Sequence, residues 1–197
     1  MTPEPVHPTK VVNFFAGPGA GKSTTASGLF FAMKLAAQHK VELVTERAKE
    51  LTYDKAWELL KNQQVVTSEQ DLRQRRLLGQ VDYVITDSPL LLGCVYGAGV
   101  WAREDMQAQW WNLFNSYDNV NIYVERAKAY QPYGRSQDED EARLMDRRLR
   151  KLTEGIIDLY VPGDEYAPAR VMQFLGLDLP PMFQTHLDAR LDAQRAA

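Results

Sequence analysis

The sequence predicts an α/β fold in which five short apolar strands alternate with helices around one sheet. Two observations predict it. Apolar runs of strand length recur along the 197 residues, and the segments between them place apolar residues at helical spacing. The first such strand also runs directly into a glycine-rich loop that an amphipathic helix follows. We therefore expect one domain over residues 10–175, with a flexible leader at 1–9 and a tail with a short helix at 176–197.

The loop after the first strand is the segment that can be interpreted most directly as chemistry. Residues 16–24 read Ala-Gly-Pro-Gly-Ala-Gly-Lys-Ser-Thr, which matches a phosphate-binding loop with Ala16 in the first glycine position. Its glycines let backbone N–H groups and the next helix N-terminus point at phosphate oxygen. Lys22 would contact the β- and γ-phosphates, and Ser23 would bind Mg²⁺. The predicted nucleotide contacts are Gly17, Pro18, Gly19, Ala20, Gly21, Lys22, Ser23 and Thr24.

The alternative for this segment is an ordinary glycine-rich turn between a strand and a helix. Ala16 in place of glycine favours that alternative slightly. The coincidence of strand, loop and amphipathic helix up to about residue 39 favours phosphate binding.

The second strand, at residues 41–46, ends in a carboxylate. Ligands of open α/β sheets bind at the carboxyl ends of the strands, so Glu46 is placed to face a substrate. A solvated charge that opens the next helix is the alternative.

Two helices are expected next, over residues 47–61 and 68–79. In the first, we expect Tyr53 and Trp57 to pack in the core, and stacking on a base is the alternative. The second begins at a Ser68 N-cap and stops at Gly79. Its spacing brings three polar side chains near one face, where they bind an anionic substrate or simply face water: Gln70, Arg73 and either Arg76 or Gln74.

The third strand, within residues 81–87, is apolar and ends in Asp87. This is what a Walker B position requires, because a carboxylate beside the phosphate loop can hold the metal's water or take a proton from an acceptor hydroxyl. A turn-capping Asp is the alternative, but the pairing with the loop at 16–24 favours the catalytic role.

The second half of the chain is expected to supply a helix at 102–115 with aromatic residues packed on the sheet, a fourth strand at 119–125 and a fifth at 156–162. Gly163 and Asp164 follow the fifth strand, where an adenine could rest, and a helix covers 165–175. Between these strands, residues 126–136 read as a mobile loop that carries Arg126 and Arg135.

Acidic residues 138–141 complement the N-terminus of a helix that carries Arg143, Arg147 and Arg150. We expect these helical arginines to form a solvated charged face, with pairs such as Glu139 and Arg143. For Arg126 and Arg135 we favour a functional role over bound phosphates.

Charge and composition exclude several classes of protein. The net charge is −3, so no global basic field attracts nucleic acid, although a local basic groove stays open. The single cysteine, Cys94, excludes an intramolecular disulfide and a cysteine-only zinc site. No stretch approaches the roughly 20 apolar residues of a membrane span. We expect a cytoplasmic protein without a membrane partner.

Residues 10–175 resemble the P-loop kinases of nucleosides and nucleotides. The resemblance is closer to a group of bacteriophage kinases, itself similar to ribosylnicotinamide and deoxynucleoside kinases. It is carried by Gly-Pro-Gly-Ala-Gly-Lys-Ser-Thr, Val-Glu-Leu-Val-Thr-Glu-Arg-Ala-Lys, Val-Ile-Thr-Asp-Ser-Pro-Leu and a later Gly-Arg ahead of an acidic helix.

This resemblance implies a P-loop kinase fold with a five-stranded parallel sheet in the order 2-3-1-4-5, flanking helices and a mobile lid. It implies ATP and Mg²⁺ as cofactors, with Ser23 and Asp87 on the metal. Glu46 would be the acceptor-site carboxylate, Asp87 the metal-side or base carboxylate, and Arg135 a lid arginine. Substrate contacts would come from Glu46, Gln70, Arg73, Arg76 and Arg126. Which of Glu46 and Asp87 takes the proton stays open.

The implied acceptor is a nucleotide unit, and the specific prediction is the 5-hydroxymethyl group of 5-hydroxymethyluracil in phage DNA, within a host cytoplasm. The alternatives are a kinase of free (deoxy)nucleosides or nucleoside monophosphates, and a P-loop ATPase or nucleotide switch without an acceptor. A homodimer is a further alternative that the sequence leaves open.

Overall fold

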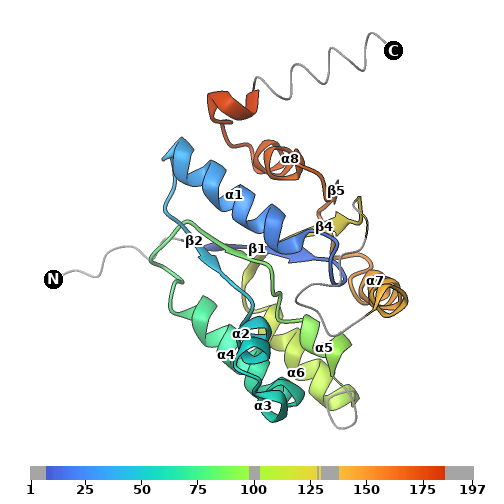
Figure 1. The fold of residues 1–197 in the computed structure, drawn as a ribbon. Coiled ribbons are helices and arrows are strands. Elements are labelled where there is room, and N and C mark those ends of the chain that lie inside the picture. The colour runs from blue at the N-terminus through green and yellow to red at the C-terminus, as the bar shows by residue number, and fades with distance from the viewer. Residues whose placement is uncertain (1–7, 98–102, 128, 130–137, 185–197) are drawn as a thin grey trace, which may run out of the picture.

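The computed structural model describes residues 8–97, 103–127, 129 and 138–184. Its centre is one parallel sheet of five strands in the order β2-β3-β1-β4-β5, as expected (Figure 1). The strands are β1 Lys10–Phe15, β2 Val41–Val44, β3 Tyr83–Thr86, β4 Asp118–Glu125 and β5 Leu159–Pro162. The switch in strand order lies beside β1, so the carboxyl end of β1 is the expected place for a ligand.

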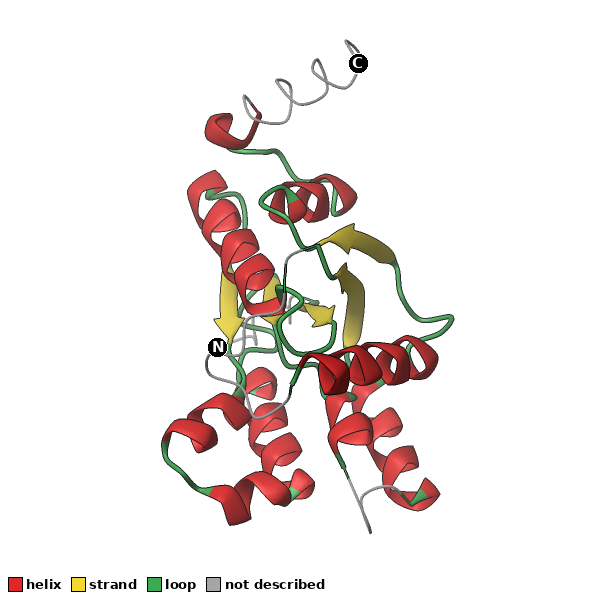
Figure 2. Ribbon diagram, turned by 45° about the vertical axis from the view of Figure 1, so that its right-hand side comes forward, coloured by secondary structure: helices red, strands yellow, loops and turns green. Residues whose placement is uncertain are grey.

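Helices cover both faces of this sheet (Figure 2). Helices α1 (Lys22–Ala36) and α8 (Ala167–Phe174) pack together on one face. The other face carries α4 (Gln63–Arg75), α5 (Leu92–Tyr96), α6 (Glu104–Phe114) and α7 (Glu139–Leu152). The short helices α2 (Arg47–Tyr53) and α3 (Trp57–Lys61) connect β2 to α4.

Strand β1 is central, and its side chains join the two layers of the core. From Val11 to Phe15 every residue is buried, as is usual for a strand covered on both faces. Successive side chains point to opposite faces. Phe14 accordingly packs with α1 and α8, whereas Phe15 packs with Trp110 and Phe114 of α6. The expected packing of the α6 aromatics on the sheet is therefore confirmed.

The helices between β2 and β3 differ from the expectation. The helix predicted over 47–61 is broken into α2 and α3, because Lys55 adopts a left-handed conformation with φ 54°. The break turns two side chains toward solvent: Tyr53 is 63% exposed and Trp57 47%. Our expectation that these aromatics belong to the core is wrong.

The next helix begins five residues earlier than the expected 68–79. Asn62, rather than Ser68, is the N-cap of α4, and its side chain accepts a hydrogen bond from the Val65 N–H at 3.3 Å. The helix ends at Arg75, and Gly79 has φ 73° in the turn that follows. The earlier cap places Ser68 inside the helix.

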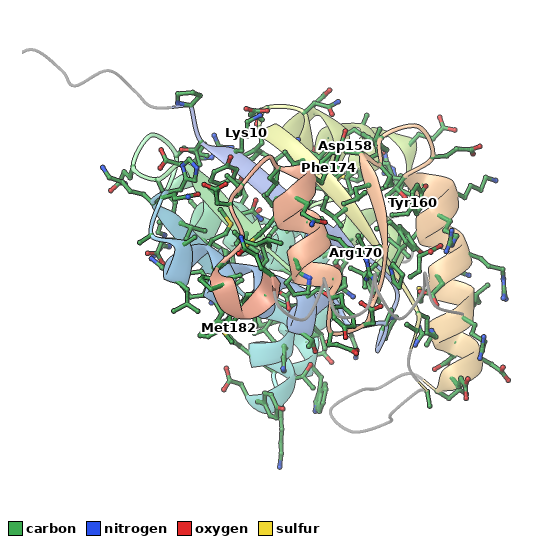
Figure 3. All side chains as sticks on the ribbon, turned by 90° about the horizontal axis from the view of Figure 1, so that it is seen from above. Lys10, Asp158, Tyr160, Arg170, Phe174 and Met182 are labelled. Atoms are coloured by element: carbon green, nitrogen blue, oxygen red, sulfur yellow. The ribbon has the colours of Figure 1, made fainter. Side chains whose placement is uncertain are left out.

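Described residues just outside the predicted domain limits of 10 and 175 contact the domain. Thr9 is buried, and its hydroxyl donates to the Val81 carbonyl at 2.6 Å and accepts from the Gly79 N–H at 2.9 Å. Beyond α8, Phe183 packs edge-on against Phe31 of α1. Figure 3 looks onto this face, with Arg170 and Phe174 on α8 and Met182 in the segment that follows. No helix among the described residues has the length and apolar character that crossing a membrane requires.

Candidate active site

The phosphate-binding loop leaves the carboxyl end of β1 and enters α1. Gly19 and Gly21 both have positive φ, at 78° and 112°, which glycine adopts without a steric cost. Gly21 is the N-cap residue of α1 and brings no side chain to cap the first turn. The first N–H groups of α1 therefore stay available to an anion, and the helix dipole favours negative charge there.

Lys22 folds back across this loop. Its Nζ donates to the carbonyl oxygen of Ala16 at 2.8 Å and lies 3.5 Å from that of Gly17. Burial lowers the pKa of Lys22, and the negative charges of Glu46, Asp87 and Asp146 oppose that shift. An enclosed ammonium among carboxylates is suited to meet a phosphate chain.

Glu46 and Asp87 follow two neighbouring strands. Since Val44 of β2 is paired with Thr86 of β3, both carboxylates come to the same edge of the sheet. Burial raises the pKa of Glu46, and the charge of Lys22 acts against the shift. Both predicted carboxylates thus influence Lys22 electrostatically, Glu46 more strongly than Asp87.

Asp87 carries an unsatisfied oxygen. The residue is 4% exposed, and its buried Oδ1 has no hydrogen-bond partner among the described residues. A buried carboxylate oxygen without a partner costs free energy, so its presence in a native fold calls for an explanation such as a ligand or ion.

The residues present fit a magnesium ion that arrives with a nucleotide. Within the described ranges, no group of three or more His, Cys, Asp and Glu side chains gathers to hold a metal alone. Mg²⁺ usually needs no such cage, because phosphates and water supply most of its oxygen ligands. The Ser23 hydroxyl and the free Asp87 oxygen are the predicted protein ligands.

Arg126, just past β4, lies against the loop. Its NH2 donates to the Pro18 carbonyl at 2.8 Å, and its Nε and NH2 donate to Asp146 Oδ2 at 3.1 and 2.9 Å. The other oxygen of Asp146 accepts the Gly17 N–H at 2.7 Å. The remaining nitrogen, NH1, is buried and has no partner among the described residues.

Sequence reasoning missed two residues here, Asp146 and Tyr96. Asp146 lies on α7 among charged neighbours, and no local pattern separates it from a solvated acid. Tyr96 ends α5, and its pKa is raised by burial and by the charges of Glu46 and Asp146. Its hydroxyl is therefore electrostatically coupled to the same group of carboxylates.

Gln70 is enclosed by the protein rather than open to a ligand. It is 2% exposed, its amide nitrogen donates to Thr45 O at 3.3 Å and Thr86 Oγ at 3.4 Å, and its oxygen accepts the Arg47 N–H at 3.1 Å. These bonds join the ends of β2 and β3. Gln70 supports the segment that carries Glu46, and a substrate contact by Gln70 stays a prediction.

Arg47 of α2 and Arg73 of α4 are engaged by glutamates. Arg73 donates twice to Glu50, with both distances 2.6 Å, and holds the pKa of Glu50 down at about 2. Arg47 pairs with Glu50 and with Glu69. Arg76 is exposed and donates to the Leu72 carbonyl of its own helix at 3.2 Å. Substrate binding by Arg73 and Arg76 therefore also stays a prediction.

On α7, two of the expected helical arginines pair with acids. Arg143 pairs with Glu139 at 2.8 Å, as expected, and Arg150 with Glu125 at 2.9 Å. Arg150 also lies over the ring of Tyr160 on β5. Arg135 lies outside the described residues, and its role stays a prediction.

A parallel sheet in the order 2-3-1-4-5, with a phosphate-binding loop after the central strand, defines a P-loop fold of the nucleotide-kinase type. Residues 11–160 match the AAA_28 family, described as an AAA domain, and the chain belongs to this family.

Among solved structures, the chain is similar to that of the NadR protein in complex with NR, with a TM-score of 0.61 and 18% identity. That match covers 87% of this chain and 53% of the NadR chain, so the present chain spans about half of its length. A shikimate kinase from Bacteroides thetaiotaomicron matches with a TM-score of 0.46 and 17% identity, over 85% of this chain and 98% of the enzyme. A search of curated proteins found no match.

Proposed function

We propose that this protein is a phosphotransferase that moves the γ-phosphoryl group of ATP to a hydroxyl group of a nucleotide-type acceptor. One observation carries the proposal: the carboxylates of Glu46 and Asp87 come to one edge of the sheet and act on Lys22 of the phosphate loop. Hydrolysis requires only a positioned water molecule beside the γ-phosphate. Transfer requires groups that orient a second substrate, and a pair of carboxylates beside the loop can do this.

On the donor side, the N–H groups at the start of α1 and the Lys22 ammonium bind the phosphate chain. Arg126 adds a buried guanidinium next to Pro18. Mg²⁺, when bound, neutralises charge on the phosphates. The segment after β5 lies beside the loop, because a Cβ on Gly163 would come within 2.3 Å of the Ala20 carbonyl oxygen. It is held there by the Gly163 N–H, which donates to Glu125 O at 2.7 Å, and by the Asp164 carboxylate, which pairs with Arg170 at 2.6 Å.

On the acceptor side, a carboxylate takes the proton of the attacking hydroxyl. The acceptor oxygen forms a bond to the γ-phosphorus as the bond from that phosphorus to the β,γ-bridging oxygen breaks, and ADP leaves. A raised pKa makes the Glu46 carboxylate a stronger base than an ordinary glutamate, which suits it to this role. Asp87 then serves on the metal side.

The charge of the acceptor side favours a hydroxyl over a phosphate as the attacking group. Arg47 and Arg73 are neutralised by Glu50 and Glu69, and the carboxylate of Glu46 adds negative charge. A neutral hydroxymethyl or ribose hydroxyl is therefore easier to accommodate than a phosphate dianion. Our specific proposal is the 5-hydroxymethyl group of 5-hydroxymethyluracil in phage DNA, supported by the motif resemblance, with free nucleosides as the alternative.

Labelling from γ-³²P-ATP tests this proposal. The acceptors are nucleosides, nucleoside monophosphates, and matched oligonucleotides with thymine or 5-hydroxymethyluracil. We expect label on the modified oligonucleotide and none on the thymine control. Label on free nucleosides alone would overturn the DNA acceptor and keep the kinase, and label found as inorganic phosphate alone would overturn transfer.

A further inference from the structure

We propose that Asp146 is a positioning residue that aims Arg126 at the terminal phosphate of the bound nucleotide. The inference rests on the nucleotide-binding half of the proposed function and is independent of the acceptor. It starts from a closed ring of contacts. Asp146 accepts from the Gly17 N–H and from Arg126, and Arg126 donates to the carbonyl of Pro18, the next residue of the loop.

The loop is built to admit this carboxylate. A Cβ atom on Gly17 would lie 2.3 Å from Asp146 Oδ1 and 2.9 Å from the Ala142 carbonyl oxygen. Both distances are shorter than real Cβ contacts, so the approach of α7 requires glycine at position 17. The carboxylate therefore fills a place that only a glycine leaves open.

Asp146 is itself held in position. The Tyr123 hydroxyl at the end of β4 donates to the Asp146 carbonyl at 3.1 Å, which ties α7 to the strand that precedes Arg126. The side chain of Asp146 is 20% exposed and that of Arg126 11%, so solvent screens this ion pair less than the surface pairs of α7. Two-point contact to Asp146 and one to Pro18 fix the guanidinium plane.

With its plane fixed, Arg126 keeps NH1 buried without a partner among the described residues. A phosphate oxygen is the ligand that a charged, unsatisfied donor beside this loop would take. In a loop of this type the backbone N–H groups hold the inner phosphates and the lysine reaches the outer ones. Lys22 Nζ lies 2.8 Å from the Ala16 carbonyl oxygen and 3.5 Å from that of Gly17, so the terminal phosphate would lie beside the limb formed by Gly17 and Pro18. Asp146 would thereby help the loop to distinguish ATP from ADP.

The affinities of AMPPNP and ADP, measured with Mg²⁺ by calorimetry and without an acceptor, test the inference. Asp146→Asn keeps an oxygen for the Gly17 N–H but loses the charge that holds Arg126. We expect AMPPNP affinity to fall about tenfold, with ADP affinity changed by less than about threefold. Arg126→Gln should show the same selective loss of AMPPNP affinity. Asp140 is an exposed acid in the first turn of α7, so Asp140→Asn should change neither affinity.

An unchanged ratio of the two affinities in Asp146→Asn would overturn the inference, as would an equal loss of both, which indicates a structural role. If Asp146→Asn does not fold, as judged by circular dichroism, the ratio of AMPPNP affinity to ADP affinity in Arg126→Gln decides. An unchanged ratio overturns the inference, and a ratio that falls about tenfold supports it. A failure of the acceptor labelling would overturn the transfer reaction and would leave these binding results unaffected.

Discussion

At the scale of a single residue, Lys22 is the side chain whose removal should affect transfer most. Its Nζ donates to the Ala16 carbonyl of its own loop, and we predict that it stabilises charge on the transferred phosphoryl group. We predict that Lys22→Ala lowers the rate of transfer by about 100-fold or more while the fold is retained. Rates from γ-labelled ATP, with circular dichroism for the fold, measure this.

The matched control is Lys34→Ala on the exposed face of the same helix, where Lys34 pairs with Glu42 at 3.3 Å. That variant should transfer phosphate at the rate of the wild type. A Lys22→Ala variant as active as this control would show that the loop is not the donor site.

The raised pKa of Glu46 makes the stability of the fold depend on pH. Burial raises its pKa above 4.5, so the folded protein holds this proton more tightly than the unfolded chain does. The stabilising contribution of the protonated form is present below the unfolded pKa and is lost as pH rises through the folded pKa. The raised pKa of Glu46 therefore makes the fold less stable at neutral pH than in acid.

We predict that Glu46→Gln raises the melting temperature at pH 7 more than at pH 4, and that it slows transfer. Thermal unfolding at the two pH values, beside initial rates, measures both effects. An equal change in melting temperature at both pH values would contradict the assigned cause of the pKa shift.

Motif spacing alone predicts Lys22 and Ser23 as site residues, and these roles stay predictions. The rule for strand ends predicts that Glu46 and Asp87 meet at one edge, where the pairing of Val44 with Thr86 brings them. Asp146 could not be found in this way, because it meets Gly17 across 129 residues of sequence. Tyr96 reaches the site through the packing of α5 beside α7, which no periodicity encodes.

At the scale of elements, β5 and the phosphate loop depend on a close approach at Gly163. A Cβ there would lie 2.3 Å from the Ala20 carbonyl oxygen and 3.1 Å from that of Glu125. We predict that Gly163→Ala destabilises the protein by about 1–3 kcal/mol, the usual cost of overpacking, and weakens nucleotide binding. Denaturant unfolding and calorimetry measure these effects.

Gly155→Ala is the control for that substitution. Gly155 has φ 82°, and a Cβ added there would meet no atom within 4 Å, so only the left-handed backbone is penalised, by about 1–2 kcal/mol. Its nucleotide affinity should stay unchanged. Equal losses of affinity in both variants would argue against a specific contact between β5 and the loop.

Helix α7 carries Asp146 and begins with a capping box. Asp138 Oδ1 accepts from the Glu141 N–H at 2.8 Å, and Glu141 Oε2 accepts from the Asp138 N–H at 2.9 Å. We predict that Asp138→Ala costs about 1 kcal/mol in unfolding free energy. Asp140→Ala removes a charge near the helix dipole but no cap, so it should cost about 0.3–1 kcal/mol and less than Asp138→Ala. A loss at Asp140 that equals or exceeds the loss at Asp138 would contradict the capping role.

The acidic start of α7 could be predicted because a helix N-terminus favours such residues. The break between α2 and α3 could not, since Lys55 is not a residue type that signals a left-handed turn. The start of α4 was misplaced because Asn62 and Ser68 are both good caps, and local sequence does not rank them.

At the scale of the whole molecule, alternating strands and helices were enough to predict a parallel α/β sheet. The order of its strands came from the resemblance to P-loop kinases, because periodicity does not determine which strands are neighbours. That order brings the loop after β1, Glu46 after β2, Asp87 after β3 and Arg126 after β4 to one edge. A donor half and an acceptor half can therefore share one site.

The partition of the γ-phosphoryl group between acceptor and water tests this two-substrate account most directly. ADP, inorganic phosphate and phosphorylated acceptor are measured in one reaction, with and without an acceptor that takes up label from γ-³²P-ATP. The account predicts one phosphorylated acceptor for each ADP and little ADP when the acceptor is omitted. ADP formed at the same rate without acceptor, with all label in inorganic phosphate, would contradict it.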